Sequence, residues 1–492
     1  MAKRLSDLIL GIPCEVRGSS EVEVKGIAYH SASVKPGFLF VAIDGFKTTG
    51  RNFIDEAINR GAIAVASADL RDVKKNWVTA IQTKVPRRFL AQVANRFYDF
   101  PSRKLSLIGV TGTNGKTTVC YLLRAMCRQL GLEPGFIGTI EHWDGERSMT
   151  ASQTTPESLD FVRMLACMVG KKLTTCICEV SSHSLELDRV FDLDFKVAVF
   201  TNLTSEHLDF HKTMEGYKKA KMKLFEMLSP TAFAVTNLDD PVGREIVHIT
   251  QGRVVTYGSI PALELSPDIT GEVVQVRQDG LDCIVRLDGK TLPVSLKLVG
   301  RYNLSNLLAA FGVAKALNWP WEVVKSGVES LEKVPGRLEP VPSNKGFSVF
   351  VDYAHTPDAL GRVLKTVREF TTGRVILVFG CGGDRDKAKR PVMGKIAAQL
   401  ADIVVVTSDN PRSENPETII REIVAGIDQS KSKGELIVEV DRREAINRAL
   451  LQAREFDAVL IAGKGHENYQ IVGNEIRHFD DREVVQEILR GI

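Results

Sequence analysis

One segment in the first quarter of the chain limits the possible fold more than any other. Gly112-Thr113-Asn114-Gly115-Lys116-Thr117-Thr118 follows the apolar run 105–110 and precedes a helical pattern over residues 117–130. Glycines let backbone amides approach phosphate oxygens, and a helix N-terminus and Lys116 add positive charge. The Thr117 hydroxyl is placed to bind Mg²⁺. The segment predicts a phosphate-binding loop, although Val110 replaces a consensus glycine, so a plain glycine-rich turn is the alternative.

Strands and helices alternate along most of the chain. Apolar strand candidates recur at 174–180, 197–201, 348–352, 375–379, 403–407 and 458–462, with helical patterns between them. This alternation favours an α/β architecture with doubly wound, mostly parallel sheets. Residues 270–300 differ, because Gln278-Asp279-Gly280 and Asp288-Gly289-Lys290 are hairpin turn signals. They predict a small antiparallel patch attached to the central domain.

Length and chain breakers divide the sequence into three predicted domains. At roughly 150 residues per domain, the 492 residues correspond to about three. Phe100-Pro101-Ser102-Arg103-Lys104 and Pro335-Gly336-Arg337 are the two breaks. We expect a small N-terminal α/β domain over residues 1–104, a central P-loop-type domain over 105–334, and a Rossmann-like C-terminal α/β domain over 335–492.

The composition excludes several classes of protein. Lys plus Arg is 64 and Asp plus Glu is 61, and the resulting net charge of +3 gives no reason to expect a nucleic-acid partner. No apolar run reaches the roughly 18 residues that a membrane span needs, and the first residues lack a secretory signal pattern. The eight cysteines show neither zinc spacing nor a disulfide framework. We therefore expect reduced, mostly buried thiols in a cytoplasmic protein.

Acids, histidines and lysines follow two further predicted strands. Glu179 ends the strand at 174–180, at the edge of a parallel sheet that faces the ligand. Its carboxylate could hold Mg²⁺ directly or through water, or it could be a surface group. The loop 201–211 contains two histidines and two acids. Histidine is not a preferred ligand of the hard cation Mg²⁺, so this argument alone favours solvated or structural histidines there. The lysines of the helix at 217–223 are either solvated or, for one of them, buried and chemically modified.

Three strand-to-loop turns in the last third of the chain carry clustered charge. They are Gly380-Cys381-Gly382-Gly383-Asp384-Arg385-Asp386, Ser408-Asp409-Asn410-Pro411-Arg412-Ser413-Glu414 and Gly463-Lys464-Gly465-His466-Glu467. If their strands are parallel, these loops converge at one sheet edge. Arginine pairs with carboxylates and acids hold ammonium groups, so the site suits a zwitterionic amino acid with an extra carboxylate. An exposed salt-bridge network is the alternative.

These segments together, in this order, resemble the Mur ligases, ATP-dependent amino-acid-adding enzymes of peptidoglycan precursor synthesis. The resemblance covers nearly the whole chain, from about Ser31 to Asp481. It implies an ATP site made of Gly112, Thr113, Asn114, Gly115, Lys116, Thr117, Thr118, Asn303, Asn306, Arg337, Asp352 and His355. It also implies contacts with a UDP-sugar peptide by Ser31, Thr154, Thr155, Ser181 and Arg189.

The resemblance extends to the metal and to catalysis. It implies Mg²⁺ held by Thr117, Glu179, His207 and a carbamylated Lys221. A carbamate turns a cation into a carboxylate-like ligand, which would explain a lysine beside Mg²⁺. Lys116, Glu179, His207 and Lys221 are the implied catalytic residues.

The amino-acid site can be specified further. Asp409-Asn410-Pro411-Arg412 is identical to the motif that recognises meso-diaminopimelate in one branch of the family, and Arg385, Gly463 and Glu467 join it in the resemblance. Lysine-adding relatives depart from this motif, and Arg412 can bind the distal carboxylate that lysine lacks. The implied reaction joins meso-2,6-diaminopimelate to the D-glutamate γ-carboxylate of UDP-N-acetylmuramoyl-L-alanyl-D-glutamate through an acyl phosphate, at the expense of ATP.

Two segments depart from the family pattern, and two other functions stay open. The uridine segment, usually Asp-Ser-Arg, reads His30-Ser31-Ala32, and a glutamine common before Arg189 is Leu187. The alternatives are a folylpolyglutamate-synthase-like ligase and a P-loop ATPase or binding module that forms no bond. In the favoured interpretation the partners are the UDP-dipeptide, meso-diaminopimelate and ATP, with no nucleic acid and no membrane, and the chain is a monomer.

Overall fold

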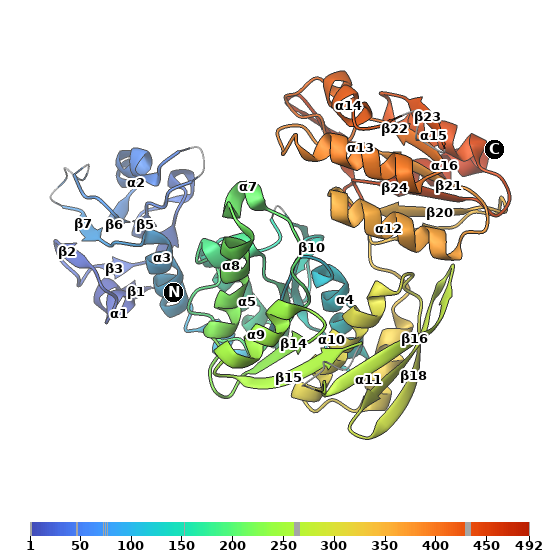
Figure 1. Ribbon diagram of the computed structural model, residues 1–492. Helices are drawn as coiled ribbons and strands as arrows, with labels where there is room; N and C mark the ends of the chain where they lie inside the picture. The colour runs from blue at the N-terminus through green and yellow to red at the C-terminus, as the bar shows by residue number, and fades with distance from the viewer. Residues whose placement is uncertain are drawn as a thin grey trace.

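The chain folds into three bodies, each built around its own sheet (Figure 1). The computed structural model describes residues 2–45, 48–71, 73, 75, 77–151, 153–259, 266–428 and 434–491. The three main sheets have five, eleven and six strands, so the predicted α/β class is confirmed. The eight cysteines are free thiols and most are buried, as predicted, although Cys167 is exposed. Among the described residues, no helix combines the length and apolar character needed to cross a membrane.

The N-terminal body is a small sheet flanked by helices, drawn in blue in Figure 1. Its strand order is β2-β7-β6-β5-β4, parallel except for β2. Helix α3 begins at Pro86, whose missing N–H is tolerated in a first turn. Its apolar face packs toward the central body. The elements are β1 (Lys3–Arg4), α1 (Leu5–Ile9), β2 (Glu15–Arg17), β3 (Glu23–Val24), β4 (Gly26–Ala28), η1 (Ser31–Ser33), β5 (Phe38–Val41), η2 (Gly50–Phe53), α2 (Ile54–Asn59), β6 (Ala62–Ser67), β7 (Thr79–Gln82), α3 (Pro86–Phe97) and η3 (Pro101–Lys104).

The central body is a large mixed sheet covered by helices. Its strand order is β11-β10-β9-β12-β8-β13-β14-β15-β16-β17-β18, with β9 to β16 paired in parallel. The middle strands are buried along their whole length, as expected for strands covered on both faces. The elements are β8 (Ser106–Thr111), α4 (Lys116–Gln129), β9 (Gly135–Ile137), β10 (Glu141–Trp143), β11 (Ser148–Thr150), α5 (Ser158–Gly170), β12 (Thr175–Glu179), α6 (Ser182–Glu186), β13 (Val197–Phe200), α7 (Leu208–His211), α8 (Met214–Glu226), β14 (Phe233–Asn237), α9 (Pro241–Ile249), β15 (Arg253–Gly258), β16 (Ile269–Arg277), β17 (Gly280–Leu287), β18 (Lys290–Leu296), α10 (Tyr302–Ala316) and α11 (Trp321–Ser330).

The antiparallel patch extends the central sheet at one edge. Strands β16, β17 and β18 form the two predicted hairpins, and β16 continues the parallel sheet by pairing with β15. The opposite edge carries β10 and β11, an antiparallel hairpin that the sequence did not predict. These two strands have three residues each, too few to show a periodic pattern.

The C-terminal body is a six-stranded sheet with helices on both faces (Figure 1, orange to red). Its strand order is β19-β20-β24-β21-β22-β23, parallel except at β19. Separate apolar clusters cover the two faces of this sheet. The elements are β19 (Glu339–Val341), β20 (Ser348–Asp352), α12 (Pro357–Phe370), β21 (Val375–Phe379), α13 (Lys389–Leu400), β22 (Ile403–Val406), α14 (Pro416–Val424), β23 (Glu435–Val438), α15 (Arg442–Gln452), β24 (Ala458–Ala462), β25 (Tyr469–Val472), β26 (Glu475–His478) and α16 (Asp481–Gly491).

Candidate active site

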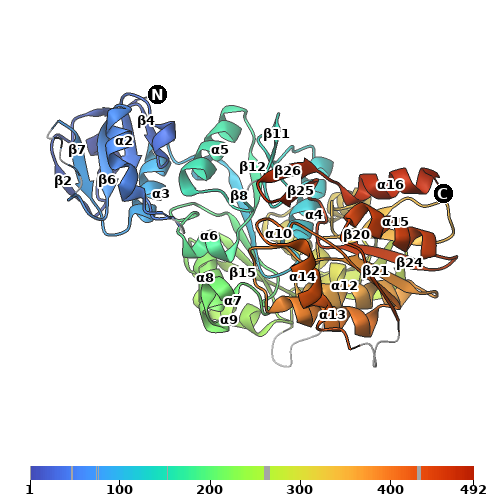
Figure 2. The ribbon, with the colours of Figure 1, turned by 90° about the horizontal axis from the view of Figure 1, so that it is seen from above.

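A polar cavity of 480 Å³ lies between the central and C-terminal bodies. The two bodies lie next to each other in both orientations of the ribbon (Figure 2). From the central body the cavity is lined by the phosphate loop, the end of β12 and the loop before α7. From the C-terminal body it is lined by Arg337, by residues 352–356 and by the first turns of α12. Predicted site residues from two bodies therefore share one cavity.

The phosphate loop needs its glycines for steric reasons. Gly112 and Gly115 have φ angles of +148° and +88°, which favour glycine. A Cβ at Gly112 would lie 1.9 Å from Thr201 Oγ1, and one at Gly115 would lie 2.3 Å from Asn306 Oδ1. The loop connects β8 to α4 as predicted, with the helix N-terminus facing the cavity. A plain glycine-rich turn would not require such close packing.

Lys116 is held by the loop itself. Its Nζ donates to the carbonyl oxygens of Gly112 at 2.9 Å and Thr113 at 2.8 Å. Burial is the main cause that lowers the pKa of Lys116, although Glu206 and Glu179 oppose it. Both acceptors are neutral carbonyls, so an anionic phosphate would be a stronger partner for this ammonium.

Glu179 and Thr117 form the acidic side of the cavity. Glu179 is fully buried, and its two oxygens accept from Thr117 Oγ1 at 3.1 and 3.0 Å. Thr139, which the sequence analysis missed, donates to the same carboxylate through its N–H at 2.8 Å and its hydroxyl at 3.0 Å. Thr139 follows β9, which pairs with β12, so its position after a strand end was the available signal. A carboxylate and a hydroxyl this close are suitable oxygen ligands for Mg²⁺.

Lys221 is buried beneath the phosphate loop rather than solvated. It is 2% exposed, and its Nζ donates to Gly112 O at 2.7 Å. Burial, followed by the nearby Lys116, lowers the pKa of Lys221 well below its usual range. The other lysines of the same helix are on its outer side, where Lys218 and Lys223 pair with glutamates. One lysine of this basic helix is therefore set apart from the rest.

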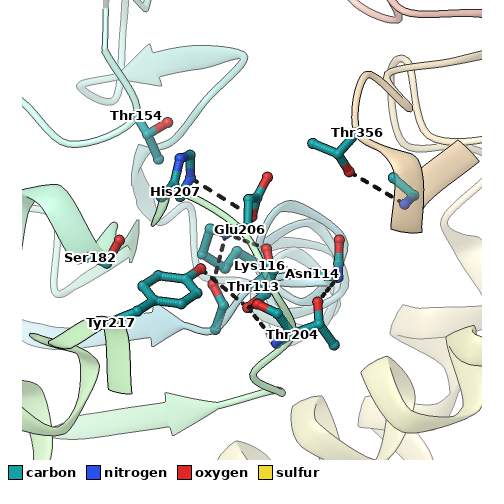
Figure 3. Close-up of polar contacts among 12 residues, drawn as sticks. Thr113, Asn114, Lys116, Thr154, Ser182, Thr204, Glu206, His207, Tyr217 and Thr356 are labelled. Carbon is teal, nitrogen blue, oxygen red and sulfur yellow. Dashed lines mark hydrogen bonds and ion pairs between the residues drawn. The ribbon is translucent and has the colours of Figure 1, made fainter. Parts of the chain in front are cut away.

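Tyr217 connects these groups, and the sequence analysis did not identify it. Its hydroxyl lies 3.1 Å from Thr113 Oγ1 (Figure 3). The centroid of its ring lies 4.5 Å from Lys221 Nζ. Tyr217 precedes Lys221 by four residues, so both lie on the same helix face. An aromatic residue at this spacing from a buried lysine was the signal that could have found it.

His207 stands at the mouth of the same cavity, paired with Glu206. Its Nε2 is 3.7 Å from Glu206 Oε2. Burial lowers the pKa of His207, while Glu206 opposes this effect, so the neutral ring able to bind a metal is favoured. Within the described chain, no group of three or more His, Cys, Asp and Glu side chains could hold a metal alone. A metal here would also depend on Thr117, on a modified Lys221, or on ligands from a bound nucleotide.

The predicted nucleotide contacts divide into lining and supporting residues. Asn306 lines the cavity, whereas Asn303 is buried and its Oδ1 accepts from Asn306 Nδ2 at 2.9 Å. Asp352 accepts from the N–H groups of Leu338 and Ala354, and burial raises its pKa. Arg337 donates to Thr117 Oγ1 at 3.2 Å. Asn303 therefore orients Asn306, while Arg337 joins the C-terminal body to the phosphate loop.

The predicted UDP-substrate residues are only partly brought together, since Thr154 and Ser181 line the cavity and the others do not. Thr154 lines the cavity, and its hydroxyl lies 3.1 Å from that of Thr139. Thr155 is buried behind it, where it donates to Glu179 O and accepts from Ser181 N. Arg189 donates to Thr155 O at 3.1 Å. Ser31 lies in the N-terminal body and donates to Glu56 at 2.8 Å.

The three charged loops of the C-terminal body meet at one sheet edge, as predicted. They follow β21, β22 and β24, which are adjacent and parallel. Asn410 Nδ2 donates to Glu467 Oε2 at 2.8 Å, and Asp409 Oδ2 would lie 2.6 Å from a Cβ at Gly463. Arg412 adopts a left-handed φ of +51° and donates to Gly383 O at 2.8 Å. Pro411 completes this loop, and Arg385 is exposed beside it.

Two features of this site were not predicted. The hairpin β25–β26 packs on the Asn410 loop, and Ile471 N donates to Asn410 Oδ1 at 2.9 Å. Arg442, in a fully buried ion pair with Asp481, donates to Ser408 O, where one of the three loops begins, and to Ala462 O, just before another. Burial, followed by Asp409, raises the pKa of Glu467. The three charged loops therefore rest on buried polar groups, unlike an exposed salt-bridge network.

Comparison with known proteins agrees with this arrangement. Residues 23–98 match the family model "Mur ligase family, catalytic domain", residues 110–314 match "Mur ligase middle domain", and residues 336–465 match "Mur ligase, glutamate ligase domain". Similar relatives are named UDP-N-acetylmuramoyl-L-alanyl-D-glutamate–2,6-diaminopimelate ligase. The one from Caldanaerobacter subterraneus is 43% identical over 99% of both chains, and one from Clostridium acetobutylicum is 43% identical over 96% of both.

A solved structure shows the same likeness in three dimensions. A UDP-N-acetylmuramoyl-L-alanyl-D-glutamate–2,6-diaminopimelate ligase superposes with a TM-score of 0.69 at 31% identity, covering 100% of this chain and 99% of that one. The phosphate loop, the buried Glu179 and the three converging loops thus occur in a chain that matches these relatives from end to end. The chain belongs to the Mur ligase family.

Proposed function

We propose that this chain joins meso-2,6-diaminopimelate to the D-glutamate γ-carboxylate of UDP-N-acetylmuramoyl-L-alanyl-D-glutamate, using ATP, in peptidoglycan precursor synthesis. The observation that carries the proposal is the full-length match to diaminopimelate ligases together with Asp409-Asn410-Pro411-Arg412 beside Glu467. A folylpolyglutamate-synthase-like ligase has no need of this motif. A nucleotide-binding module that forms no bond has no need of the amino-acid site.

The three bodies have separate tasks in this proposal. Residues 1–104 bind the UDP-sugar, residues 105–334 bind ATP and carry the chemistry, and residues 335–492 capture the amino acid. The enzyme works as a cytoplasmic monomer on three small molecules. Because the nucleotide cavity is lined by both the central and C-terminal bodies, closure of one on the other assembles the complete site.

The first step is activation of the substrate carboxylate. The γ-carboxylate oxygen attacks the γ-phosphorus of ATP, the bond to the bridging oxygen breaks, and ADP leaves with that electron pair. Lys116 exchanges its two loop carbonyls for phosphate oxygens and neutralises their charge. Thr154, Thr155, Ser181 and Arg189 hold the peptide so that its carboxylate lies in line.

Mg²⁺ would supply further neutralisation of phosphate charge when bound. Thr117 and Glu179 fit this role, since both present oxygens into the cavity, and His207 and a carbamylated Lys221 complete the set. The lowered pKa of Lys221 favours the neutral amine that CO₂ requires. This supports carbamylation of Lys221 in place of its bond to Gly112 O.

The second step forms the amide bond. The neutral amine of meso-diaminopimelate attacks the acyl carbon, and the tetrahedral intermediate collapses as phosphate leaves and the nitrogen loses its proton. Arg385 and Arg412 bind carboxylates of the amino acid, while Asp409 and Glu467 bind the ammonium of its distal centre. Asn410, Pro411 and Gly463 keep these loops in place.

The test is a panel of amino acids offered with ATP and the UDP-dipeptide. We expect phosphate release to require meso-diaminopimelate and L-lysine to be used poorly. Phosphate release that ignores the amino acid would contradict the ligase proposal, and equal turnover with L-lysine would contradict the role of Arg412. Arg412→Ala should weaken diaminopimelate use by about tenfold or more, the value of a charge-assisted hydrogen bond. Arg477→Ala, at an exposed position in β26, is the matched control.

Carbamylation needs its own measurement. Lys221→Ala should lose activity and recover part of it when a small carboxylate is added, because the carboxylate replaces the carbamate oxygens. Full activity of Lys221→Ala without any addition would contradict the carbamate. Lys219→Ala, an exposed neighbour in the same helix, should behave as the unchanged chain.

A further inference from the structure

Glu157 stands where the N-terminal body meets the substrate-binding segment of the central body. It precedes α5 directly and follows the Thr154-Thr155-Pro156 segment by one residue. Its side chain is only 8% exposed. One oxygen, Oε1, accepts from Ser158 N at 3.0 Å and so caps the helix. The other oxygen, Oε2, is directed to two arginines.

These two arginines come from different bodies. Arg87, in α3 of the N-terminal body, donates to Glu157 Oε2 through Nη1 and to Asp44 O through Nη2 at 2.8 Å. Arg189, in the central body, places its Nε 3.6 Å from the same Oε2. Their side chains are 18% and 12% exposed. One buried carboxylate therefore lies between two partly buried guanidinium groups.

Arg189 is held by contacts on two sides of its guanidinium. Its Nη1 donates to Thr155 O and to Gln153, whereas its Nε is buried and makes no hydrogen bond. Burial is the main cause that lowers the pKa of Arg189, and Glu157 opposes it. Glu157 is thus the carboxylate that faces this arginine and fixes its direction.

We propose that Glu157 is a positioning residue for the UDP-dipeptide, because its carboxylate orients the Arg189 side chain toward the substrate. Through its ion pair with Arg87, Glu157 also couples the orientation of Arg189 to the docking of the N-terminal body. Two cations share one anion here, so one positive charge remains for a substrate that carries phosphates and carboxylates. The inference rests on the proposed function, since it assigns a role within the same substrate site.

A purely structural role would give a different pattern of effects. If Glu157 only fastened two bodies together, any other cross-boundary ion pair would matter equally. Arg103 and Asp194 provide that comparison, because they join the same two bodies at 2.7 Å with side chains 59% and 50% exposed. Asp194→Asn is therefore the matched control for Glu157→Gln.

The experiment measures binding of UDP-N-acetylmuramoyl-L-alanyl-D-glutamate by calorimetry without ATP, and then steady-state kinetics. Glu157→Gln keeps the size of the side chain and can still accept from Ser158 N. We expect its Kd and its KM for the UDP-dipeptide to rise about tenfold, on the scale of one charge-assisted hydrogen bond. The kcat value and the KM values for ATP and diaminopimelate should stay unchanged, and so should every constant of Asp194→Asn.

A second variant guards against loss of folding in the first. Arg87→Gln should weaken UDP-dipeptide binding in the same selective way, and Arg87→Lys should restore part of it. Unchanged binding in Glu157→Gln and Arg87→Gln, or equal weakening in Asp194→Asn, would overturn the inference. If the unchanged chain bound no UDP-dipeptide at all, the proposed function itself would fail, and this result is distinct from either outcome for the variants.

Discussion

The boundary between the N-terminal and central bodies is filled by apolar side chains, whereas the boundary between the central and C-terminal bodies encloses a polar cavity. One apolar cluster runs from Leu90 and Phe97 of α3 to Leu107 and Val162 of the central body. In the described part of the chain, the two apolar clusters of the C-terminal body include only one buried residue from before position 335, Val299. The second boundary is instead crossed by polar contacts such as Arg337 to Thr117 and Thr204 to Asp358.

This difference indicates which boundary can move. Separating the N-terminal body from the central body would expose apolar surface to water, which costs about 25 cal/mol per Å². This boundary therefore resists motion. Polar contacts at the second boundary can be exchanged for water at little cost. An enzyme that admits ATP and then brings an amine to an acyl phosphate needs such a closing boundary, while the UDP-sugar can be held by a fixed one.

The largest expected effect lies in the apolar boundary. Leu90 is fully buried there, and Leu90→Ala should lower the free energy of unfolding by about 2–5 kcal/mol, from lost burial and the cavity left behind. Below the unfolding temperature, the KM for ATP should not change. Thermal unfolding measures the change in stability, and kinetics at roughly 20 °C below Tm measure the KM for ATP. Leu10→Ala, at a side chain 76% exposed, is the control, and an equal loss there would contradict the argument.

The next effect lies in the polar boundary and concerns rate. Lys116→Ala should reduce kcat by about 10²–10³-fold, because it removes a preorganised cation from the developing phosphate charge. Its affinity for the UDP-dipeptide should stay unchanged, since the Lys116 ammonium donates to carbonyls of the phosphate loop rather than to the residues that hold the peptide. Phosphate release measures kcat, and calorimetry measures the affinity for the UDP-dipeptide. A Lys116→Ala variant that kept its kcat would mean that the loop does not hold the reacting phosphate.

The sequence predicted most of this architecture because the strands are long apolar runs. The strands β20, β21 and β24 lie at the predicted residues, and α4 is displaced by one residue at each end. The hairpins β10–β11 and β25–β26 escaped prediction, since their strands lack the continuous apolar run that marks β13 and β22, which have only four residues each.

The sequence also predicted where the site residues gather, but not how they are supported. The rule that loops converge at the carboxyl edge of parallel strands located Glu179 and Asp409 correctly. Tyr217, Thr139 and Arg442 were missed because their roles depend on contacts between segments far apart in the chain. Glu157 was missed for the same reason, since its two arginines lie 70 and 32 residues away.

Acid should loosen the polar boundary before the apolar one. Burial, followed by nearby cations, lowers the pKa of His355 and brings that of His466 from an ordinary 6.5 to about 3. The folded state then binds fewer protons than the unfolded state below pH 6.5. The stability from these neutral rings is therefore complete above that pH and is lost as the pH falls toward 3. Hydrogen exchange at pH 7 and pH 4.5 should show α12 and β20 losing protection before α3 and α5, and the reverse order would contradict this.

The smallest expected effect concerns Asp358, which makes one contact across the polar boundary and also pairs with Arg362 of its own helix at 2.9 Å. Thr204 Oγ1 donates to Asp358 Oδ2 at 3.3 Å and accepts from Asn114 of the phosphate loop at 3.3 Å, so it ties α12 to that loop (Figure 3 shows Asn114 and Thr204). Asp358 is 40% exposed, so Asp358→Asn should cost only about 0.2–1 kcal/mol. Because the tie ends on the phosphate loop, this cost should appear as a severalfold rise in the KM for ATP, with the UDP-dipeptide constants unchanged. Glu369→Gln, which breaks the exposed Arg301–Glu369 pair across the same boundary away from the loop, should leave that KM unaltered. An equal rise in both variants would mean that the whole boundary, rather than the tie to the phosphate loop, controls ATP binding.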